Sequence, residues 1–355
     1  MIKKVFIGAA FLLLSASIIQ PVSAQSIIPQ PESITRQQGT FTLAKGLQGV
    51  TNLKGEDFKI LNQYTSDVMN IPFSSVKNPS ADAPLRLICT GTEQEAAMAA
   101  DSVSLQGYEL NVTPTAVTIQ ARTPMGLFYG LQTLRQLEKD RQIPCVKITD
   151  TPRFAYRGLM IDCSRHFWSK DEIKKQLDAM AYFKLDRFHW HLTDGGGWRM
   201  EVKQYPRLTE ETAYRTESDW TKWWNGKNRH YTPNPSRLVC WKGMNIHGGY
   251  YTQDDIKEIV DYAAARHITI IPEIEMPGHS DEVVYAYPEL SCTGKPYTQS
   301  DLCVGKEQTY TFMENVLKEV MQLFPSKYIH IGGDEAERRT WKTCPDCQRV
   351  MKDYH

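Results

Sequence analysis

From residue 155 onward, the sequence alternates short apolar runs with amphipathic stretches, and this alternation restricts the fold more than any other feature. The stretches between the runs carry apolar residues at helical spacing, and Ser169 to Glu172 forms a capping box in front of one of them. A repeated strand and helix alternation favours a parallel sheet with helical crossovers, so we predict an α/β fold. The runs with the composition of buried strands are 158–163, 188–194, 268–276 and 328–333.

Polar residues gather where each predicted strand ends. In parallel α/β folds, the carboxyl ends of the strands lie at one edge of the sheet, and that edge carries the chemistry. We therefore expect these side chains to form a functional site. They are Asp162, Ser164, Arg165 and His166, then Thr193 and Asp194, then Glu275 and His279, and finally Asp334 and Glu335.

Residues 25–150 have a different pattern. The stretch 107–121 alternates apolar and polar residues about a Pro-Thr turn, which predicts a β-hairpin, and 123–140 has helical spacing. No catalytic grouping stands out here, so we interpret 25–150 as a small α/β domain that serves as scaffold. The predicted catalytic part is 151–355.

The first 24 residues have the pattern of a signal peptide. A basic MIKK precedes an apolar run that is too short for a membrane span, and Val22-Ser23-Ala24 supplies the small residues of a cleavage site. We therefore expect export to the periplasm or the medium, with no membrane insertion after cleavage. The sequence does not set the oligomeric state.

Charge and cysteine content restrict the partners. Lysine plus arginine equals aspartate plus glutamate at 41 each, and no basic stripe is interleaved with aromatic residues, so nucleic acid is not an expected partner. In an exported chain we expect Cys292 and Cys303 to form a disulfide across a Gly/Pro-containing loop. Cys344 and Cys347 form a lone CxxC, which fits a structural disulfide or reduced thiols, or else a redox pair or half of a zinc site.

The connection between Trp198 and a helix starting at Thr252 is too long for a plain loop, and such loops are usually functional. Its aromatic residues could stack on sugar rings, or they could form a small core of their own beneath the loop. They include Trp198, Trp220, Trp223, Trp224, Trp241, Tyr214, Tyr231, Tyr250 and Tyr251.

The adjacent acids Asp334 and Glu335 suit the cleavage of a glycosidic bond, which needs one proton donor and one group that attacks or stabilises the developing cation. Crowding two like charges separates their pKa values, so that the two acids can take unequal roles. Neighbours on a regular strand point to opposite faces, and Gly332-Gly333 is a plausible break that lets both reach one pocket. Pairing of these acids with Arg338 or Arg339 is the structural alternative.

A zinc-dependent amidohydrolase is a different reading of the same strand ends. His189 and His191 lie at i and i+2 on one strand face, and with His279 and Asp334 they could bind Zn²⁺. Both histidines precede the polar end of their strand, which favours buried, hydrogen-bonded core residues.

Four motifs, in this order and spacing, resemble the β-N-acetylhexosaminidases of glycoside hydrolase family 20. They are RGLMIDCSRHF, FHWHLTDGGGWR, IPEIEMPGHS and HIGGDE, and the resemblance runs from about residue 27 to the last residue. It implies a (β/α)₈ TIM barrel preceded by a small α/β domain. It also implies a retaining, exo-acting enzyme that removes terminal N-acetylglucosamine or N-acetylgalactosamine from glycans and needs no metal or organic cofactor.

The resemblance also assigns roles to residues. Glu335 is the expected general acid and then base, and Asp334 orients the acetamido group of the substrate, whose carbonyl oxygen is the nucleophile of an oxazolinium mechanism. Asp194 and His279 are expected to form a relay to the acid/base, and Arg157 is expected to grip sugar hydroxyls.

The sequence departs from the family pattern at Gly195-Gly196 and at Glu275, where many relatives carry an acidic or amide pair and an aspartate. A closed barrel needs eight strands in about 250 residues, and only four are predicted after 155. We therefore expect the front part of a barrel, which leaves open an inactive or merely sugar-binding chain.

Overall fold

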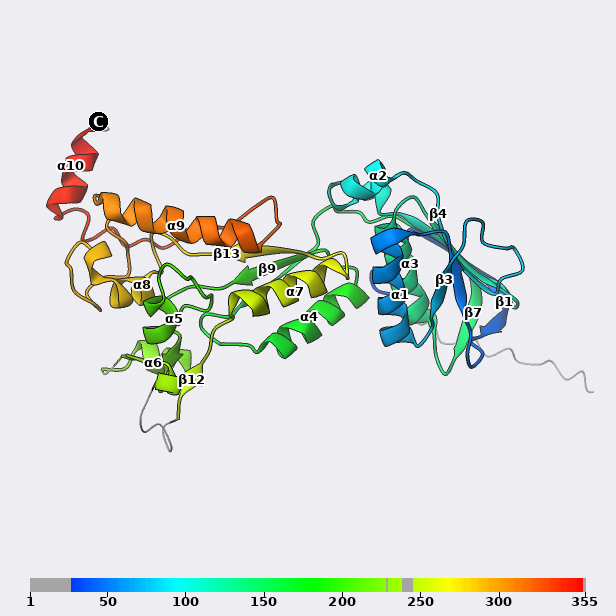
Figure 1. Ribbon diagram of the computed structural model, residues 1–355, viewed down its shortest axis with the longest axis horizontal. Helices are drawn as coiled ribbons and strands as arrows, with labels where there is room; N and C mark the ends of the chain where they lie inside the picture. Colours follow the sequence, from blue (N-terminus) through cyan, green and yellow to red (C-terminus); the bar gives the residue numbers. More distant parts are fainter. Residues whose placement is uncertain (1–26, 228, 238–244, 354–355) are drawn as a thin grey trace, which may run out of the picture.

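The computed structural model describes residues 27–227, 229–237 and 245–353 (Figure 1). The predicted signal peptide lies outside the described residues. Within them, no helix is long and apolar enough to cross a bilayer. Two separate β-sheets organise the chain, a seven-stranded one formed by 33–150 and a three-stranded parallel one that begins at 158.

The first sheet has the strand order β1-β7-β5-β6-β4-β2-β3 and mixes parallel with antiparallel pairs. The predicted hairpin is confirmed, since Tyr108 pairs with Ala121 and Val112 with Val117. The predicted helix is confirmed as α3, where the Thr123 side chain caps the first turn and Pro124 begins the helix. The elements are β1 (Ser33–Thr42), β2 (Gly49–Thr51), α1 (Gly55–Met69), β3 (Phe73–Ser75), β4 (Leu85–Cys89), α2 (Glu93–Met98), η1 (Ala99–Asp101), η2 (Val103–Leu105), β5 (Tyr108–Val112), β6 (Val117–Ala121), α3 (Pro124–Leu137) and β7 (Gln142–Asp150).

The second sheet has the order β13-β9-β8 with parallel pairing throughout. Helices α4 and α7 lie side by side along it, and α9 packs beyond α7 (Figure 1). Both α4 and α7 begin with capping boxes, at Ser169 and Thr252, and they bury their apolar faces as predicted. The elements are β8 (Gly158–Asp162), α4 (Lys170–Tyr182), β9 (Arg187–His191), α7 (Gln253–Ala264), β13 (Thr269–Glu273), α8 (Asp281–Ala286), η4 (Pro288–Leu290), α9 (Glu307–Leu323) and α10 (Pro345–Asp353).

The fourth predicted strand, 328–333, is not formed, and that prediction is wrong. The segment runs parallel to β13 and makes an isolated bridge between His330 and Glu273, and the Met276 N–H also donates to the Ile331 carbonyl at 3.1 Å. Its pairing stops because Gly332 and Gly333 adopt positive φ values of 61° and 95°. Ile331 remains half exposed, so the segment lacks the burial that normally fixes a strand.

The long connection between β9 and α7 forms a small layer of its own beside the second sheet (Figure 1). Its short strands order as β11-β10-β12. The elements are α5 (Arg207–Glu211), β10 (Tyr214–Arg215), α6 (Trp220–Trp224), β11 (Tyr231–Thr232), η3 (Pro235–Arg237) and β12 (His247–Gly248).

Candidate active site

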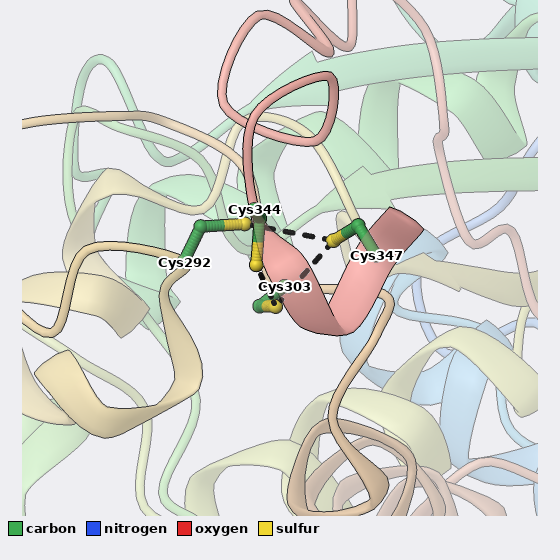
Figure 2. Close-up of side chains that lie close together, drawn as sticks. All are labelled: Cys292, Cys303, Cys344 and Cys347. Carbon is green, nitrogen blue, oxygen red and sulfur yellow. Dashed lines mark hydrogen bonds between the residues drawn. The ribbon is translucent and has the colours of Figure 1, made fainter. Parts of the chain in front are cut away.

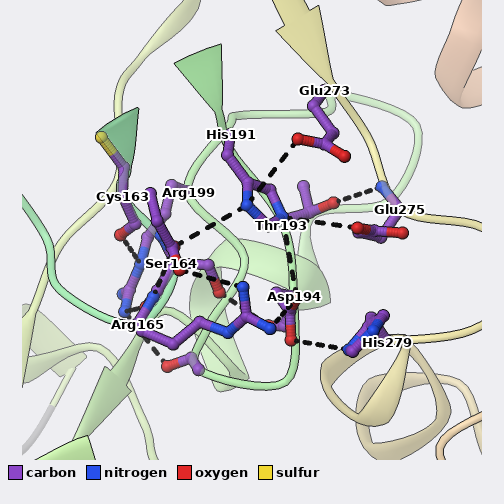
Figure 3. A network of polar contacts seen from close by, with 12 residues as sticks. Cys163, Ser164, Arg165, His191, Thr193, Asp194, Arg199, Glu273, Glu275 and His279 are labelled. Atoms are coloured by element: carbon purple, nitrogen blue, oxygen red, sulfur yellow. Dashed lines mark hydrogen bonds and ion pairs between the residues drawn. The ribbon is translucent and has the colours of Figure 1, made fainter. Parts of the chain in front are cut away.

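The strand register of the second sheet brings its polar carboxyl ends to one level. Asp162 at the end of β8 lies opposite His191 of β9, and His191 lies opposite Glu273 of β13. The residues that follow these ends, including Asp194 and Glu275, therefore converge above the sheet. Figure 3 shows this convergence, which the sequence pattern predicts.

Asp194 is the centre of the network. Its side chain is only 3% exposed, and one oxygen lies 2.6 Å from Nη2 of Arg165 while the other lies 3.4 Å from Nδ1 of His279. The backbone N–H of Gly195 donates to Asp194 as well. A buried carboxylate with a cation on each side is compensated by charge and held in one orientation.

His279 connects this buried carboxylate to the acid pair. Nε2 of His279, on the other side of the ring, lies 3.4 Å from Oε2 of Glu335 and 3.7 Å from Oδ2 of Asp334. Hydrogen bonding to Asp194 raises the pKa of His279 to about 9. The imidazole is therefore protonated at neutral pH and faces both acids as a cation.

The acids themselves lie at the exposed rim. The side chain of Asp334 is 67% exposed and that of Glu335 is 79% exposed. The predicted break of the pleat is present, because Gly332, Gly333 and Glu335 all have positive φ. The break turns both side chains towards His279, and their nearest oxygens and Nε2 of His279 lie within 4.8 Å of one another.

Glu275 lies beneath this break. It is 3% exposed, and its Oε2 accepts the backbone N–H of Gly333 at 3.2 Å. A Cβ atom at Gly332 would lie 1.6 Å from the same oxygen, so only glycine lets the acid loop cross over Glu275. Burial raises the pKa of Glu275 to about 7. The acid loop therefore packs directly on Glu275, with no side chain at Gly332 between them.

Arg199 holds together the loops around the network by hydrogen bonds to their backbone carbonyls. It is 1% exposed and donates to the carbonyl oxygens of Cys163 at 3.0 Å and Ser164 at 2.6 Å, as well as to loop carbonyls farther along the chain. A Cβ at Gly196 would lie 2.7 Å from the Ser164 carbonyl, so the glycine at this departure from the family pattern allows close backbone contact. Sequence reasoning did not single out Arg199, because its side chain donates hydrogen bonds to backbone carbonyls that are mostly distant from it in the sequence.

Arg157 is not brought to this site. It precedes β8, at the amino end of the sheet, where it donates to the Lys184 carbonyl at 2.7 Å and the Tyr129 hydroxyl at 2.8 Å and pairs with Asp186 at 3.2 Å. It therefore joins helix α3 to the second sheet at the end opposite the acids. The arginine at the site is Arg165, which the strand-end pattern had included.

Packing accounts for the buried rings of the aromatic loop. Trp198 and Trp223 are buried, at 1% and 4% exposed. Trp224 is 38% exposed, with the Arg229 guanidinium 4.1 Å from its ring centre. Trp241 lies outside the described residues.

The zinc set considered for an amidohydrolase is divided among three separate groups. His189 lies with Glu273 and His330, and His191 with Glu273 and Glu275, whereas His279 lies with Asp334 and Glu335. Oε2 of Glu273 lies 2.6 Å from Nε2 of His189, which is half-buried, and His191 is buried. The reading of buried core histidines therefore fits His191 fully and His189 in part.

Comparisons with known proteins agree with the motifs. The profile "Glycosyl hydrolase family 20, catalytic domain" matches residues 154–355, and "Glycosyl hydrolase family 20, domain 2" matches 24–151. A beta-hexosaminidase of Porphyromonas gingivalis is 41% identical over 70% of this chain and 31% of its own length, and one of Vibrio furnissii is 33% identical over 92% and 51%.

Solved structures give the same picture. The β-N-acetylhexosaminidase of Bacteroides fragilis aligns with a TM-score of 0.74 at 32% identity, over 93% of this chain and 60% of that one. An exo-β-N-acetylglucosaminidase of Vibrio harveyi, solved with N-acetylglucosamine, aligns with a TM-score of 0.74 at 29% identity, over 93% and 50%. The chain thus spans between about a third and three fifths of these relatives.

Proposed function

Because the chain belongs to glycoside hydrolase family 20, whose catalytic domain is a TIM barrel behind an N-terminal domain, we propose that it acts as an exo-β-N-acetylhexosaminidase. The strands β8, β9 and β13 are then the first part of that barrel. The substrates are glycans or oligosaccharides that end in N-acetylglucosamine or N-acetylgalactosamine. The N-acetylglucosamine bound by the Vibrio harveyi relative supports this class of sugar.

The proposed reaction uses the substrate's own acetamido group as the nucleophile. Glu335 gives its proton to the glycosidic oxygen while the acetamido carbonyl oxygen attacks the anomeric carbon, which yields an oxazolinium ion and the free leaving group. Asp334 accepts the amide N–H and offsets the developing positive charge. Glu335 then takes a proton from the water that opens the ring, so that the product retains its configuration.

The closeness of the two acids fits a reaction in which the substrate supplies the nucleophile. The separation of about 6.5–9.5 Å that an ordinary inverting pair needs to admit a water molecule does not apply to such a reaction. Here an oxygen of Asp334, an oxygen of Glu335 and Nε2 of His279 lie within 4.8 Å of one another. An internal nucleophile needs no such gap, and its fixed position supplies a high effective concentration.

The observation that carries the proposal is the continuous path from Asp194 through His279 to Glu335. The buried carboxylate holds the imidazolium, and Nε2 of the imidazolium faces Oε2 of Glu335 at 3.4 Å without blocking it. Arg165, bound between Asp162 and Asp194, takes the sugar-gripping role that the resemblance had given to Arg157.

The test is turnover of a chromogenic N-acetylglucosaminide by Glu335→Gln. This change removes the transferable proton and should lower kcat by about 100-fold or more. Glu337→Gln is the matched control, because Glu337 lies two residues away and pairs only with exposed Arg339 in the described contacts. Equal rates in the two variants would refute the role of Glu335. Saccharide binding without hydrolysis by the wild-type chain would favour a sugar-binding protein instead.

Export is part of the proposal, on the pattern of the first 24 residues. The enzyme would then meet its glycans in the periplasm or the medium. Amino-terminal sequencing of the protein recovered from cell fractions tests this directly: a start near residue 25 outside the cytoplasm is expected, and an intact Met1 in the cytoplasm would contradict it.

A further inference from the structure

Four cysteine sulfurs meet at one point near the end of the described chain, in a group we name the thiol cluster. It consists of Cys292, Cys303, Cys344 and Cys347, and Figure 2 shows their side chains converging from three segments. Cys292 follows η4, Cys303 precedes α9, and the last two lie at the start of α10. All four are free, so the predicted Cys292–Cys303 disulfide is not formed and that prediction is wrong.

The distances within the thiol cluster fit a single tetrahedral ion. Sγ of Cys303 lies 3.7 Å from Sγ of Cys344 and 3.6 Å from that of Cys347, and Sγ of Cys292 lies 3.7 Å from that of Cys347. Zinc bound to four thiolates at about 2.3 Å separates neighbouring sulfurs by about 3.8 Å. All four sulfurs lie within 4.8 Å of one another, which leaves room for one ion between them.

The surroundings suit a closed, buried site. Cys303, Cys344 and Cys347 are buried, in a small group with Val304 and Trp341 that is separate from the main core. The backbone N–H groups of Asp346 and Cys347 are directed at the Cys344 sulfur, as the first turn of a helix allows. Such donors stabilise negative sulfur, and the CxxC spacing with a turn between the cysteines is that of zinc sites.

Backbone packing and several hydrogen bonds bring the three segments together. At Gly305 a Cβ would lie 2.2 Å from the backbone of Asp346 and Cys347, so two backbones pass each other without side chains between them. The Trp341 indole donates to the Leu302 carbonyl at 3.0 Å, and Nζ of Lys306 donates to the carbonyls of Glu289 and Ser291. A crosslink at the cysteines would fix the arrangement that these contacts set up.

The same segments support the acid loop. Asp301, two residues before Cys303, accepts the N–H of Arg338 at 2.9 Å, and Leu302 donates to the Pro277 carbonyl at 2.7 Å. The loop that bears Glu335 therefore runs from its contact with β13 to the thiol cluster. Fixing the cluster fixes the far end of that loop.

We propose that the thiol cluster binds one Zn²⁺ as a closed structural site. Each cysteine gives up its proton, so that one Zn²⁺ and four thiols yield a tetrathiolate complex and four released protons, with no change of oxidation state. The four sulfurs fill the tetrahedral coordination, and no position is left for water or substrate. The ion fixes the loop behind the acids in place. This structural role does not depend on which sugar the enzyme cleaves.

The test is metal content and thiol state of the full chain, purified without a chelating tag. Zinc and iron are measured together by plasma mass spectrometry, and we expect about one zinc per chain. Cys347→Ser should lose the zinc, whereas the control Cys89→Ser, which changes a half-buried thiol outside the cluster, should keep it. Iron in place of zinc, or zinc retained in Cys347→Ser, would overturn the proposal.

Two further measurements on the wild-type chain guard against a variant that fails to fold. Cobalt exchanged into the protein should give the intense visible absorption of a tetrahedral thiolate complex, and its absence in a zinc-free but folded chain counts against the site. Denaturation in an alkylating reagent without reductant should label all four cysteines. Two intact disulfides in that experiment would show that the four cysteines form an oxidised crosslink instead, which the oxidising environment outside the cytoplasm favours.

Discussion

Gly332→Ala should destabilise the protein and displace the acid loop. The backbone at Gly332 has a φ of 61°, where an L-residue costs about 1–2 kcal/mol. The added Cβ would also lie 1.6 Å from Oε2 of Glu275, which must move and give up the N–H of Gly333 at a further cost of about 1–3 kcal/mol. The sum is a loss of about 2–5 kcal/mol in the free energy of unfolding.

Gly294→Ala separates these two contributions. Its φ of 65° is nearly the same, and nothing lies within 4 Å of its added Cβ, so it carries the backbone cost alone. Urea unfolding of the two variants beside the wild type gives the difference directly, and turnover reports the displaced acids. Equal destabilisation by the two changes, with normal turnover in Gly332→Ala, would refute the packing of the loop on Glu275.

Three further predictions concern the network and the sheet junction. The pKa of His279 is about 9 in the folded protein, above its unfolded value, so protonated His279 stabilises the fold fully below about pH 6.5, and this contribution is lost as the pH rises through 9. His279→Gln should therefore flatten the fall in the free energy of unfolding between these two pH values. An unchanged slope would contradict the ion pair with Asp194. Arg165→Met should raise KM for the sugar, while Arg157→Met should leave KM unchanged and lower stability; the reverse pattern would restore Arg157 to the site. Arg199→Met leaves several buried carbonyls without a donor and should cost about 3 kcal/mol or more in chemical unfolding, against less than about 0.5 kcal/mol for exposed Arg339→Met.

Local chemistry made much of the fold predictable. The capping boxes at Ser169 and Thr252 fix their helices with bonds between residues three apart, and the 107–121 hairpin pairs across a short turn. The sequence also predicted that Asp194, His279 and the acid pair would meet, because parallel strands place their ends at one edge.

Contacts between distant segments were not predictable in the same way. Nothing near Cys292 in the sequence indicates that its sulfur lies 3.7 Å from that of Cys347, because loops that pack on one another through backbone carry no periodic signal. The failure of 328–333 as a strand depended on Gly332 and Gly333, which were read correctly as a break but not as the end of pairing. Arg157 was assigned to the site by the resemblance alone, although it directly precedes the predicted strand 158–163 and so lies at the end of the sheet opposite the acids.

The bonds around Lys184 bear on any attempt to dissect the protein. This lysine is 4% exposed, and it reaches across to Asp150 at 3.2 Å and the Tyr108 hydroxyl at 3.0 Å, both in the first sheet. Expressing 151–355 alone would remove both partners, but it would also open the lysine to water, so no buried charge would be orphaned. In the intact chain, by contrast, Lys184→Met leaves Asp150 without its cation, and breaking a buried pair in this way costs about 3–5 kcal/mol. The substitution in the whole protein, and not excision of the amino-terminal half, therefore measures what this ion pair contributes.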